Sequence, residues 1–263
     1  MERLLSAAGW ISTILVLVLG IFYVAIVWIF TVPFDKGRYH AGRAFRHLAM
    51  AQVKLNPLWD FHTEGKAPPN PREPYVAVSN HESYADIFLI SHFPWEMKWL
   101  SKEALFRIPV MGWLMRMAGD IPVKRGSRES AMQALAECRK RLQNRVSVMI
   151  FPEGTRSPNG DLLPFKDGAF KLAIETGAPI LPIAVAGTRN CMAKHSFQFR
   201  RARAKARVLE PISTAGMSSK DIPALKERTR AVIDSARKQL QSDLGLESPA
   251  ASAVQFTANQ VNT

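Results

Sequence analysis

The sequence PYVAVS (residues 74–79) is a short apolar run, rich in β-branched residues, that leads directly into the polar sequence NHESYAD (80–86). The apolar pattern returns as VSVMIF (146–151) and as APILPIAV (178–185). Short apolar runs of this kind predict buried strands. A stretch with helical periodicity, residues 127–144, lies between the first two runs. Strands that alternate with helices favour an α/β domain.

The charge of the chain limits its partners. Its 263 residues include 35 Lys and Arg against 22 Asp and Glu, which gives a net charge of +13. Such an excess predicts an acidic partner, and nucleic acid or an anionic membrane surface are the usual two. Cys138 and Cys191 have neither metal-site nor disulfide-framework spacing. We therefore expect no metal site, and free thiols fit a reducing compartment.

The N-terminal sequence indicates which of the two acidic partners is the right one. Residues 10–32 carry no charge and are rich in Leu, Val, Ile, Phe and Trp. As a helix this run would be about 35 Å long, enough to cross a bilayer core. It is longer than the apolar region of a signal peptide and has no small-residue cleavage site at its end. We therefore expect a membrane anchor, and a nucleic-acid partner would leave this segment without a purpose.

Basic residues are concentrated after the apolar run, with only Arg3 before it. The positive-inside rule therefore places the rest of the chain in the cytoplasm, at the inner membrane. On a helix over 36–55, Lys36, His40, Arg43, His47 and Lys54 fall on one face. The opposite face carries Ala41, Ala44, Phe45, Leu48 and Leu55. This pattern favours a helix lying among anionic lipid headgroups, although an ordinary core helix would show the same period. A spanning and a half-embedded apolar helix both remain open.

The remaining segments define the domain and its end. Residues 63–74 form a proline-rich loop. Residues 196–208 alternate between basic and small apolar side chains, which predicts a half-buried strand; its basic face would meet either solvent or headgroups. Ser218 and Asp221 have the spacing of a capping box at the start of a final helix, and Gly245 would stop it. Residues 246–263 have little core potential, so we expect a disordered tail.

Two polar clusters follow predicted strands, NHESYAD (80–86) and FPEGTRS (151–157). Sites in open α/β sheets form beyond the carboxyl ends of strands, so both clusters are candidates. His81 with Asp86 offers a general base oriented by a carboxylate. Five residues on one helix would turn them about 140° apart. The pair therefore requires His81 on the turn before a helix and Asp86 inside it. Alone, this spacing also suits a structural histidine.

Four ordered blocks decide between these interpretations. They are residues 80–86; KEALFRIPVMG (102–112) with GDIPVKR (119–125); FPEGTRS (151–157); and ILPIAV (180–185). Together they resemble the glycerophospholipid acyltransferase family, specifically the 1-acylglycerol-3-phosphate acyltransferases, over roughly residues 75–190. The resemblance implies an α/β acyltransferase domain with a mixed sheet flanked by helices, over 57–245. Residues 1–56 would be its membrane anchor.

The resemblance implies transfer of an acyl group from a coenzyme A or acyl-carrier-protein thioester to the sn-2 hydroxyl of lysophosphatidic acid. His81 would be the general base and Asp86 its orienting partner, with no covalent nucleophile, cofactor or metal. Residues expected to bind the phosphate and glycerol are Lys102, Arg125, Glu153, Gly154, Thr155 and Arg156. Residues expected to support the motifs are Asn80, Pro109, Gly112, Pro152 and Pro182.

Glu153 has two open interpretations, a contact to the glycerol hydroxyl or an ion pair that anchors an arginine. Lys166 stands in a turn where many relatives carry a second lysine, so we do not count on basic help from that turn. Gly187-Thr188-Arg189 resembles a further family loop of open role. Two alternatives remain for the whole protein: an acyltransferase for another lysolipid, such as a lyso-aminolipid, and a non-catalytic lipid-binding membrane protein.

Overall fold

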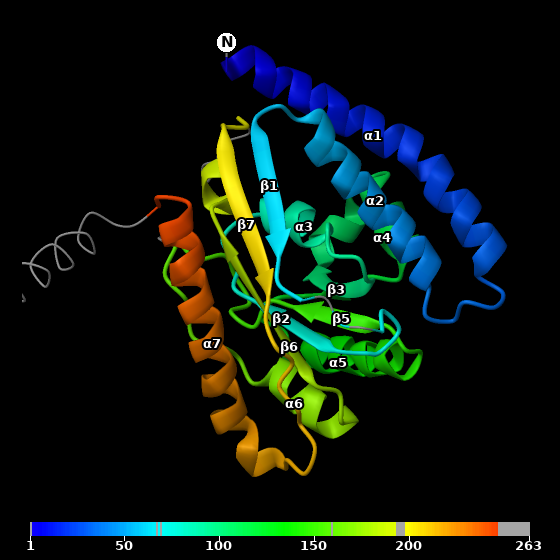
Figure 1. Cartoon of the computed structure of the whole chain (residues 1–263). Helices are drawn as coiled ribbons and strands as arrows, with labels where there is room; N and C mark the ends of the chain where they lie inside the picture. The colour runs from blue at the N-terminus through cyan, green and yellow to red at the C-terminus, as the bar shows by residue number, and fades with distance from the viewer. Residues whose placement is uncertain (1, 67, 69, 159, 193–197, 247–263) are drawn as a thin grey trace, which may run out of the picture.

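The computed structural model describes residues 2–66, 68, 70–158, 160–192 and 198–246, and within them the chain forms one seven-stranded sheet (Figure 1). The strand order is β1-β7-β6-β2-β5-β3-β4. Neighbouring strands are parallel except β6 and β7, so the sheet is mixed, as expected. The strands are β1 (Trp59–Glu64), β2 (Val76–Ser79), β3 (Met97–Lys102), β4 (Ile121–Val123), β5 (Ser147–Ile150), β6 (Ile180–Ala186) and β7 (Ala202–Val208).

The three apolar runs of the sequence form the centre of this sheet. Every residue of β2, β5 and β6 is buried. Strands covered on both faces read as continuous apolar runs, because neither set of side chains meets water. The predicted strands are therefore confirmed, with the carboxyl ends of β2, β5, β3 and β4 along one edge of the sheet and that of β6 beside them.

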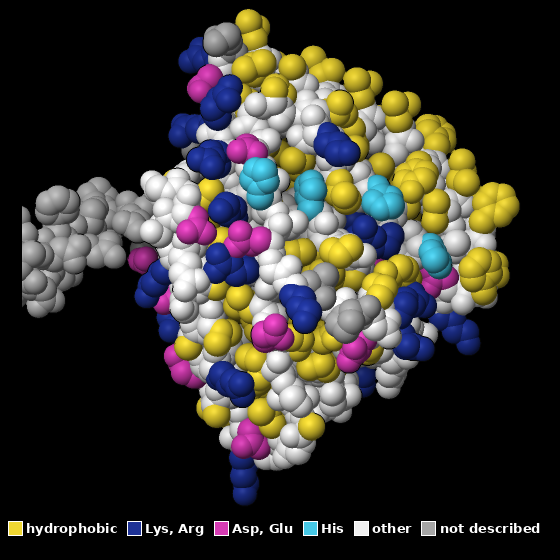
Figure 2. Space-filling view, in the orientation of Figure 1, with side chains coloured by type: hydrophobic (Ala, Val, Ile, Leu, Met, Phe, Trp, Pro, Cys, Tyr) yellow, Lys and Arg dark blue, Asp and Glu magenta, His cyan; other side chains and the backbone are white. Residues whose placement is uncertain are grey.

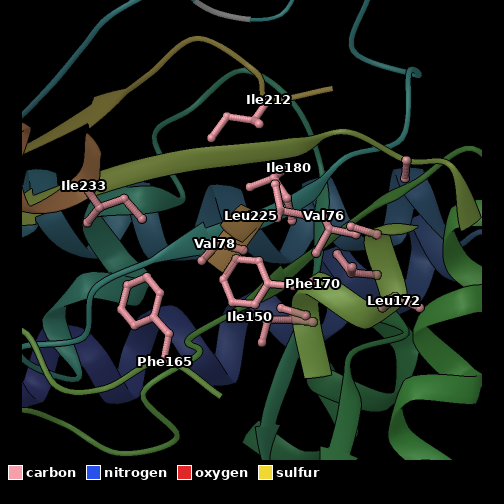
Figure 3. Packing of buried hydrophobic residues seen from close by; sticks show 14 of the residues in the cluster. Val76, Val78, Ile150, Phe165, Phe170, Leu172, Ile180, Ile212, Leu225 and Ile233 are labelled. Atoms are coloured by element: carbon pink, nitrogen blue, oxygen red, sulfur yellow. The ribbon is translucent and has the colours of Figure 1, made fainter. Parts of the chain in front are cut away.

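One face of the sheet is covered by α5 (Arg128–Gln143), α6 (Gly168–Thr176) and α7 (Ile222–Asp243) (Figure 1). Val76 and Ile150 from the sheet pack with Phe165 and Phe170 in the core beneath these helices (Figure 3). The predicted helix over 127–144 is α5, and the Ser127 hydroxyl accepts the backbone N–H of Ser130 at 3.2 Å. The capping box is also present, with Asp221 accepting from the backbone of Ser218 at 2.7 Å.

The other face is covered by α3 (Ala85–Ile90), α4 (Met111–Ala118) and α2 (Tyr39–Leu55), and α1 (Glu2–Thr31) lies outside α2 (Figure 1). The short 3-10 helices are η1 (Glu103–Arg107), η2 (Thr188–Cys191) and η3 (Ser219–Asp221). Helix α1 starts earlier than the predicted run 10–32, and α2 starts three residues later than the predicted 36–55. Within the described residues, α1 alone is long and apolar enough to cross a membrane.

Helix α1 packs against the domain through small residues. A side chain at Gly20 would collide with Leu48 of α2, and one at Gly9 would lie 2.8 Å from the ring of Phe199. The Trp10 ring stacks on that same ring with centroids 4.7 Å apart. The segments 1–56 and 57–245 therefore share packed contacts.

The predicted faces of α2 are only partly as expected. His40, His47 and Lys54 are exposed, and Ala41 and Ala44 are buried. Arg43, assigned to the basic face, instead donates to the backbone carbonyls of Phe93 and Trp95 at 2.9 and 3.2 Å. Leu55, assigned to the apolar face, is exposed. In the same last turn Val53 is buried against Trp59 and Phe199, so Leu55 lies on the side of the helix that faces away from that core.

The basic strand near the C-terminus is β7, shorter than the predicted 196–208. Residues 193–197 lie outside the described residues, as does most of the predicted tail, residues 247–263. Arg207 pairs with Glu64 of β1 at 2.5 Å, and Lys205 lies 3.7 Å from Asp243 of α7. These acids neutralise much of the basic face, which favours the solvated interpretation. Strand β1 itself was not predicted, and it ends two residues inside the predicted loop 63–74.

Candidate active site

His81 and Asp86 lie at the junction between β2 and α3. His81 is on the loop after the strand, and Asp86 is in the first turn of the helix. The imidazole Nδ1 is 2.7 Å from Asp86 Oδ2, and both residues are buried. This is the arrangement that their spacing required. Because a carboxylate only accepts, Nδ1 carries the shared proton and Nε2 is left as the acceptor.

Asp86 is held by four donors. Besides His81, its Oδ2 accepts the backbone N–H groups of Glu82 at 2.8 Å and Ser83 at 3.1 Å. Its Oδ1 accepts the hydroxyl of Thr188, which follows β6. The carboxylate is fixed in position by these bonds and in turn fixes the ring of His81. Thr188 lies in the loop that the sequence left without a role, and only the folded structure connects it to Asp86.

Glu153 joins the two polar clusters through backbone bonds. Its Oε1 accepts the backbone N–H of His81 at 2.7 Å, and its Oε2 accepts that of Leu163 at 3.0 Å. The backbone N–H of Ser157 donates to the His81 carbonyl at 2.9 Å. Burial raises the pKa of Glu153, against the two N–H donors. Among the described residues Glu153 forms no ion pair with an arginine. Its observed contacts hold the backbone of His81 in place, and the contact to the glycerol hydroxyl stays a prediction.

Two further contacts hold the loop of His81. The side-chain amide of Asn80 donates to the Val185 carbonyl at 2.9 Å and accepts the Val185 N–H at 2.8 Å. The ring of Phe151, at the end of β5, stacks on the imidazole with centroids 3.9 Å apart and planes 15° from parallel. Asn80 therefore ties the loop to β6, and Phe151 fixes the ring plane of His81.

His81 faces a cavity of about 430 Å³ with a basic wall. Of the predicted residues, Lys102, Arg125, Pro152 and Gly154 line it. Three further cationic residues without a predicted role also line it, namely Lys124, Arg128 and Lys166. Its apolar wall includes Leu100, Val123, Leu135 and Ile150. The cavity therefore offers cations and an apolar surface beside one base, as a phosphorylated lipid would require.

Lys166 lines the cavity, so its turn does contribute a basic side chain, contrary to expectation. A side chain at Gly154, where φ is +70°, would place its Cβ 2.6 Å from Lys166 Nζ. The lysine thus passes directly over this glycine at the cavity. Only a residue without a Cβ leaves room for it and adopts this backbone freely. The close approach depends on the fold of the loop 152–168, which the sequence does not display.

The other predicted residues lie outside the lining of this cavity. The Arg156 guanidinium sits over the Tyr84 ring, 4.1 Å from its centroid, and Thr155 is exposed. Pro109 and Gly112 shape the turn between η1 and α4, where a side chain at Gly112 would collide with the Phe106 carbonyl. Pro182 is buried in the middle of β6 and accepts from the Leu209 N–H at 2.9 Å. Among the described residues, no group of three or more His, Cys, Asp or Glu is placed to hold a metal.

The chain is similar in sequence to known acyltransferases. Residues 60–186 match the Acyltransferase family model. A chloroplastic 1-acyl-sn-glycerol-3-phosphate acyltransferase of Brassica napus is 38% identical over 167 residues, 62% of this chain and 47% of that protein. The 1-acyl-sn-glycerol-3-phosphate acyltransferase alpha of Ovis aries is 34% identical over 175 residues, 66% of this chain and 61% of that protein. The chain therefore spans about half to six-tenths of the length of these relatives.

The fold comparison covers more of the chain. The crystal structure of the 1-acyl-sn-glycerophosphate (LPA) acyltransferase PlsC from Thermotoga maritima superimposes with a TM-score of 0.67 at 28% identity. The match covers 89% of this chain and 98% of that one. By fold and by sequence, the protein carries a domain of the acyltransferase family. The resemblance to the glycerophospholipid acyltransferases, and the mixed α/β fold that it implied, are confirmed.

Proposed function

We propose that this protein transfers an acyl group from a thioester to the sn-2 hydroxyl of 1-acylglycerol-3-phosphate and so forms phosphatidic acid. The observation that carries the proposal is the His81–Asp86 hydrogen bond of 2.7 Å at a cavity with a basic wall. The names of the relatives and of the superimposed structure support this acceptor.

In the proposed reaction, His81 Nε2 takes the proton of the acceptor hydroxyl as its oxygen attacks the thioester carbonyl. The new C–O bond gives a tetrahedral intermediate, which collapses as the C–S bond breaks. The imidazolium then returns its proton to the departing thiolate, so the products are the ester and the free thiol. Asp86 stabilises the imidazolium while staying ionised itself, as in other carboxylate–histidine pairs. The step needs no covalent enzyme intermediate, no cofactor and no metal.

The acceptor phosphate is assigned to cationic groups at the cavity, Lys102 and Arg125, with Lys166 added from the structure. Arginine and lysine are the usual partners of phosphate oxygens. Arg156 and Thr155 stay predicted contacts to the phosphate or glycerol. From its stacked position on Tyr84, Arg156 would have to turn to reach a ligand in the cavity.

The membrane is reached, in this proposal, through α1. Its outward face is apolar and exposed at Leu4, Ile11, Leu15, Phe22 and Phe30. Figure 2 shows hydrophobic side chains along the outer edge of the molecule over this helix. The inward face packs on α2 and α4, so the structure favours a half-embedded helix over one that leaves the domain to span the bilayer. The domain would face the cytoplasm at the inner membrane.

Thiol release tests the activity. Purified protein in neutral detergent micelles, given lysophosphatidic acid and labelled acyl-coenzyme A, should form labelled phosphatidic acid and free thiol in equal amounts. His81→Ala should abolish both, whereas His62→Ala, at an exposed histidine of β1, should leave them unchanged. Turnover retained in His81→Ala would refute the base assignment. Acyl-carrier protein as a parallel donor distinguishes the two thioesters.

The alternatives predict different outcomes in the same assay. Equal turnover with a lysolipid that lacks a phosphate monoester would assign the enzyme to another acceptor. Binding of lysophosphatidic acid without any thiol release would indicate a lipid-binding protein. Neither the intact dyad nor its bracket of hydrogen bonds has a use in a pure binder, because binding requires no base.

A further inference from the structure

A second cavity, of about 460 Å³, lies at the edge of the sheet beside β4, away from His81. The linings of the two cavities share no residue. Pro122 lines this one and Val123 lines the first, and adjacent strand residues point to opposite faces of a sheet. Four arginines line the second cavity, contributed by the α1–α2 loop, η1, α4 and α5: Arg38, Arg107, Arg116 and Arg141.

Backbone carbonyls hold three of these arginines in place. Arg38 Nη1 donates to the Arg116 carbonyl, Arg116 Nη1 to the Phe106 carbonyl at 2.7 Å, and Arg141 Nε to the Gly119 carbonyl at 3.2 Å. A side chain at Gly119 would lie 3.1 Å from Arg38 Cδ, so the arginine packs closely across this glycine. Such bonds position the guanidinium groups without neutralising their charge.

Few carboxylates compensate these charges. Glu103 pairs with Arg107 at 2.8 Å, and Glu137 lies 3.9 Å from Arg141. Asp120 also lines the cavity, but it is bonded to the buried Arg46 at 2.5 Å. Partial burial, followed by the charge of Arg141, lowers the pKa of the Arg38 guanidinium. Like charges therefore face each other across the cavity, and an anion with several oxygens would relieve that repulsion.

Exposed apolar residues are close in the chain to the arginines that line this cavity. Ile108, next to Arg107, is 48% exposed, and Trp113 is 55% exposed. Trp113 and Arg116 are three residues apart on α4 and so lie on one face of that helix. Phe34, four residues before Arg38, is 71% exposed. Helix α4 packs beside α1 through Leu114 and Val24. An aromatic and aliphatic rim next to arginines is typical of a protein surface at the lipid headgroup level.

We propose that this four-arginine cavity binds the phosphate of an anionic phospholipid headgroup. The proposal rests on the membrane placement given above, but not on the acyl transfer itself. The phosphate groups of the acyl donor share the same chemistry. The apolar rim favours the membrane lipid, because a soluble phosphate gains nothing from exposed Trp113 and Phe34.

Vesicle binding by the full chain tests the site. Dilute protein is floated with vesicles of phosphatidylcholine alone or with one part in three of phosphatidylglycerol. Wild type should bind the anionic vesicles more tightly. The double variant Arg116→Gln/Arg141→Gln should lose about tenfold or more of that preference, since each arginine near an anionic surface adds roughly a factor of five. The matched control, Arg201→Gln/Arg228→Gln, removes two exposed arginines elsewhere and should lose much less.

A second variant covers the case in which the double variant fails to fold. Within the part of the chain that the structure describes, Arg107 is bonded only through its surface pair with Glu103, so Arg107→Gln should fold normally and lose part of the same preference. Equal losses in the site variants and the control would overturn the proposal, because only overall charge would then matter.

The four-arginine cavity could instead bind the phosphate groups of acyl-coenzyme A. The KM for acyl-coenzyme A, measured in neutral micelles, tests this alternative. An unchanged KM for the donor in Arg116→Gln/Arg141→Gln, together with the lost lipid preference, supports the headgroup site. A raised KM with an unchanged lipid preference would overturn it. If wild type forms no phosphatidic acid at all, the acyltransferase proposal fails, while the vesicle result still decides on the four-arginine cavity.

Discussion

Charged side chains lie at both ends of β3, but they are exposed to a cavity at one end and buried in ion pairs at the other. At the carboxyl end, Lys102 lines the open cavity of His81, and no ion pair found among the described residues involves it or its neighbour Arg125. At the amino end, Glu96 and Lys98 are fully buried and meet Arg46 of α2 and Asp120. The cations at the carboxyl end are therefore available to a ligand, whereas the charges at the amino end sum to zero.

The buried set, which we call the four-charge cluster, connects α2 to the sheet. Lys98 Nζ donates to Glu96 at 3.0 Å and to the carbonyls of Arg38 and Ala118 at 2.7 and 2.6 Å. Burial lowers the pKa of Lys98, and the charges of Glu96 and Asp120 oppose this. Charges that neutralise one another inside the protein fix a structure, whereas uncompensated charges at an opening recruit a substrate.

The largest expected effect on stability comes from breaking this cluster. Lys98→Met leaves Glu96 and Asp120 with only Arg46 between them, so unfolding should become easier by about 3–5 kcal/mol. Denaturant titration in micelles measures the change. The double variant Lys98→Met/Glu96→Gln restores neutrality and should recover part of the loss. A loss below about 1 kcal/mol in the single variant would show that the cluster does not hold α2.

Next is Glu82, a buried carboxyl beside the dyad. Burial, followed by the charge of Asp86, raises its pKa from 4.5 to about 8. Because the folded protein holds this proton more tightly than the unfolded chain, stability from this group is complete below about pH 4.5. It is lost as pH rises through about 8. Glu82→Gln cannot ionise, so it should be more stable than wild type by about 2–5 kcal/mol above pH 8.

Melting temperatures across pH 5 to 9 check this prediction. The difference between Glu82→Gln and wild type should be small at pH 5 and should grow with pH, at about 2–4 °C per kcal/mol. A difference that stays constant across this range would show that Glu82 does not titrate there.

A smaller loss is expected when Asn80 is replaced. Asn80→Ala removes both bonds to Val185 and leaves the Val185 N–H and carbonyl without these partners, at a cost of about 2 kcal/mol. Asn70→Ala, which removes one exposed bond to Arg72, is the control and should change stability by less than about 0.5 kcal/mol. Equal stability of the two variants would contradict the role given to Asn80.

The smallest expected effect is on substrate binding at the cavity of His81. Arg125→Gln should raise the KM for lysophosphatidic acid about tenfold, the loss of one charged hydrogen bond of roughly 1.4 kcal/mol. The KM for a lysolipid without a phosphate monoester should not change. Lys171→Gln, at an exposed lysine of α6, serves as the control. Equal effects on both lysolipids would remove Arg125 from the phosphate site.

The sequence predicted the parts of this molecule that depend on local pattern. The apolar runs became β2, β5 and β6 because strands buried on both faces must be apolar throughout. The His81–Asp86 spacing fixed a loop-to-helix junction because no single helix could join the pair. The capping box at Ser218 and Asp221 is a local hydrogen-bond pattern and was equally readable.

Contacts between segments that are distant in the chain could not be predicted from the sequence. Thr188 reaches Asp86 across 102 residues, and Glu153 reaches the backbone of His81 across 72. The sequence also gives no sign that Arg46 is buried. It is next to the exposed His47 on the same helix, and its burial depends on the position of its partner Asp120. The approach of Lys166 to Gly154 depends on a loop conformation that no spacing encodes.

The catalytic claim is that Asp86 makes His81 a base by fixing its tautomer and its orientation. The turnover of Asp86→Asn with lysophosphatidic acid and acyl-coenzyme A tests it most directly. The asparagine can keep the shape of the site but cannot stabilise an imidazolium. We expect thiol release to fall by about 10²–10⁴ while the variant remains folded and membrane-bound. Turnover within threefold of wild type in a folded variant would contradict the account.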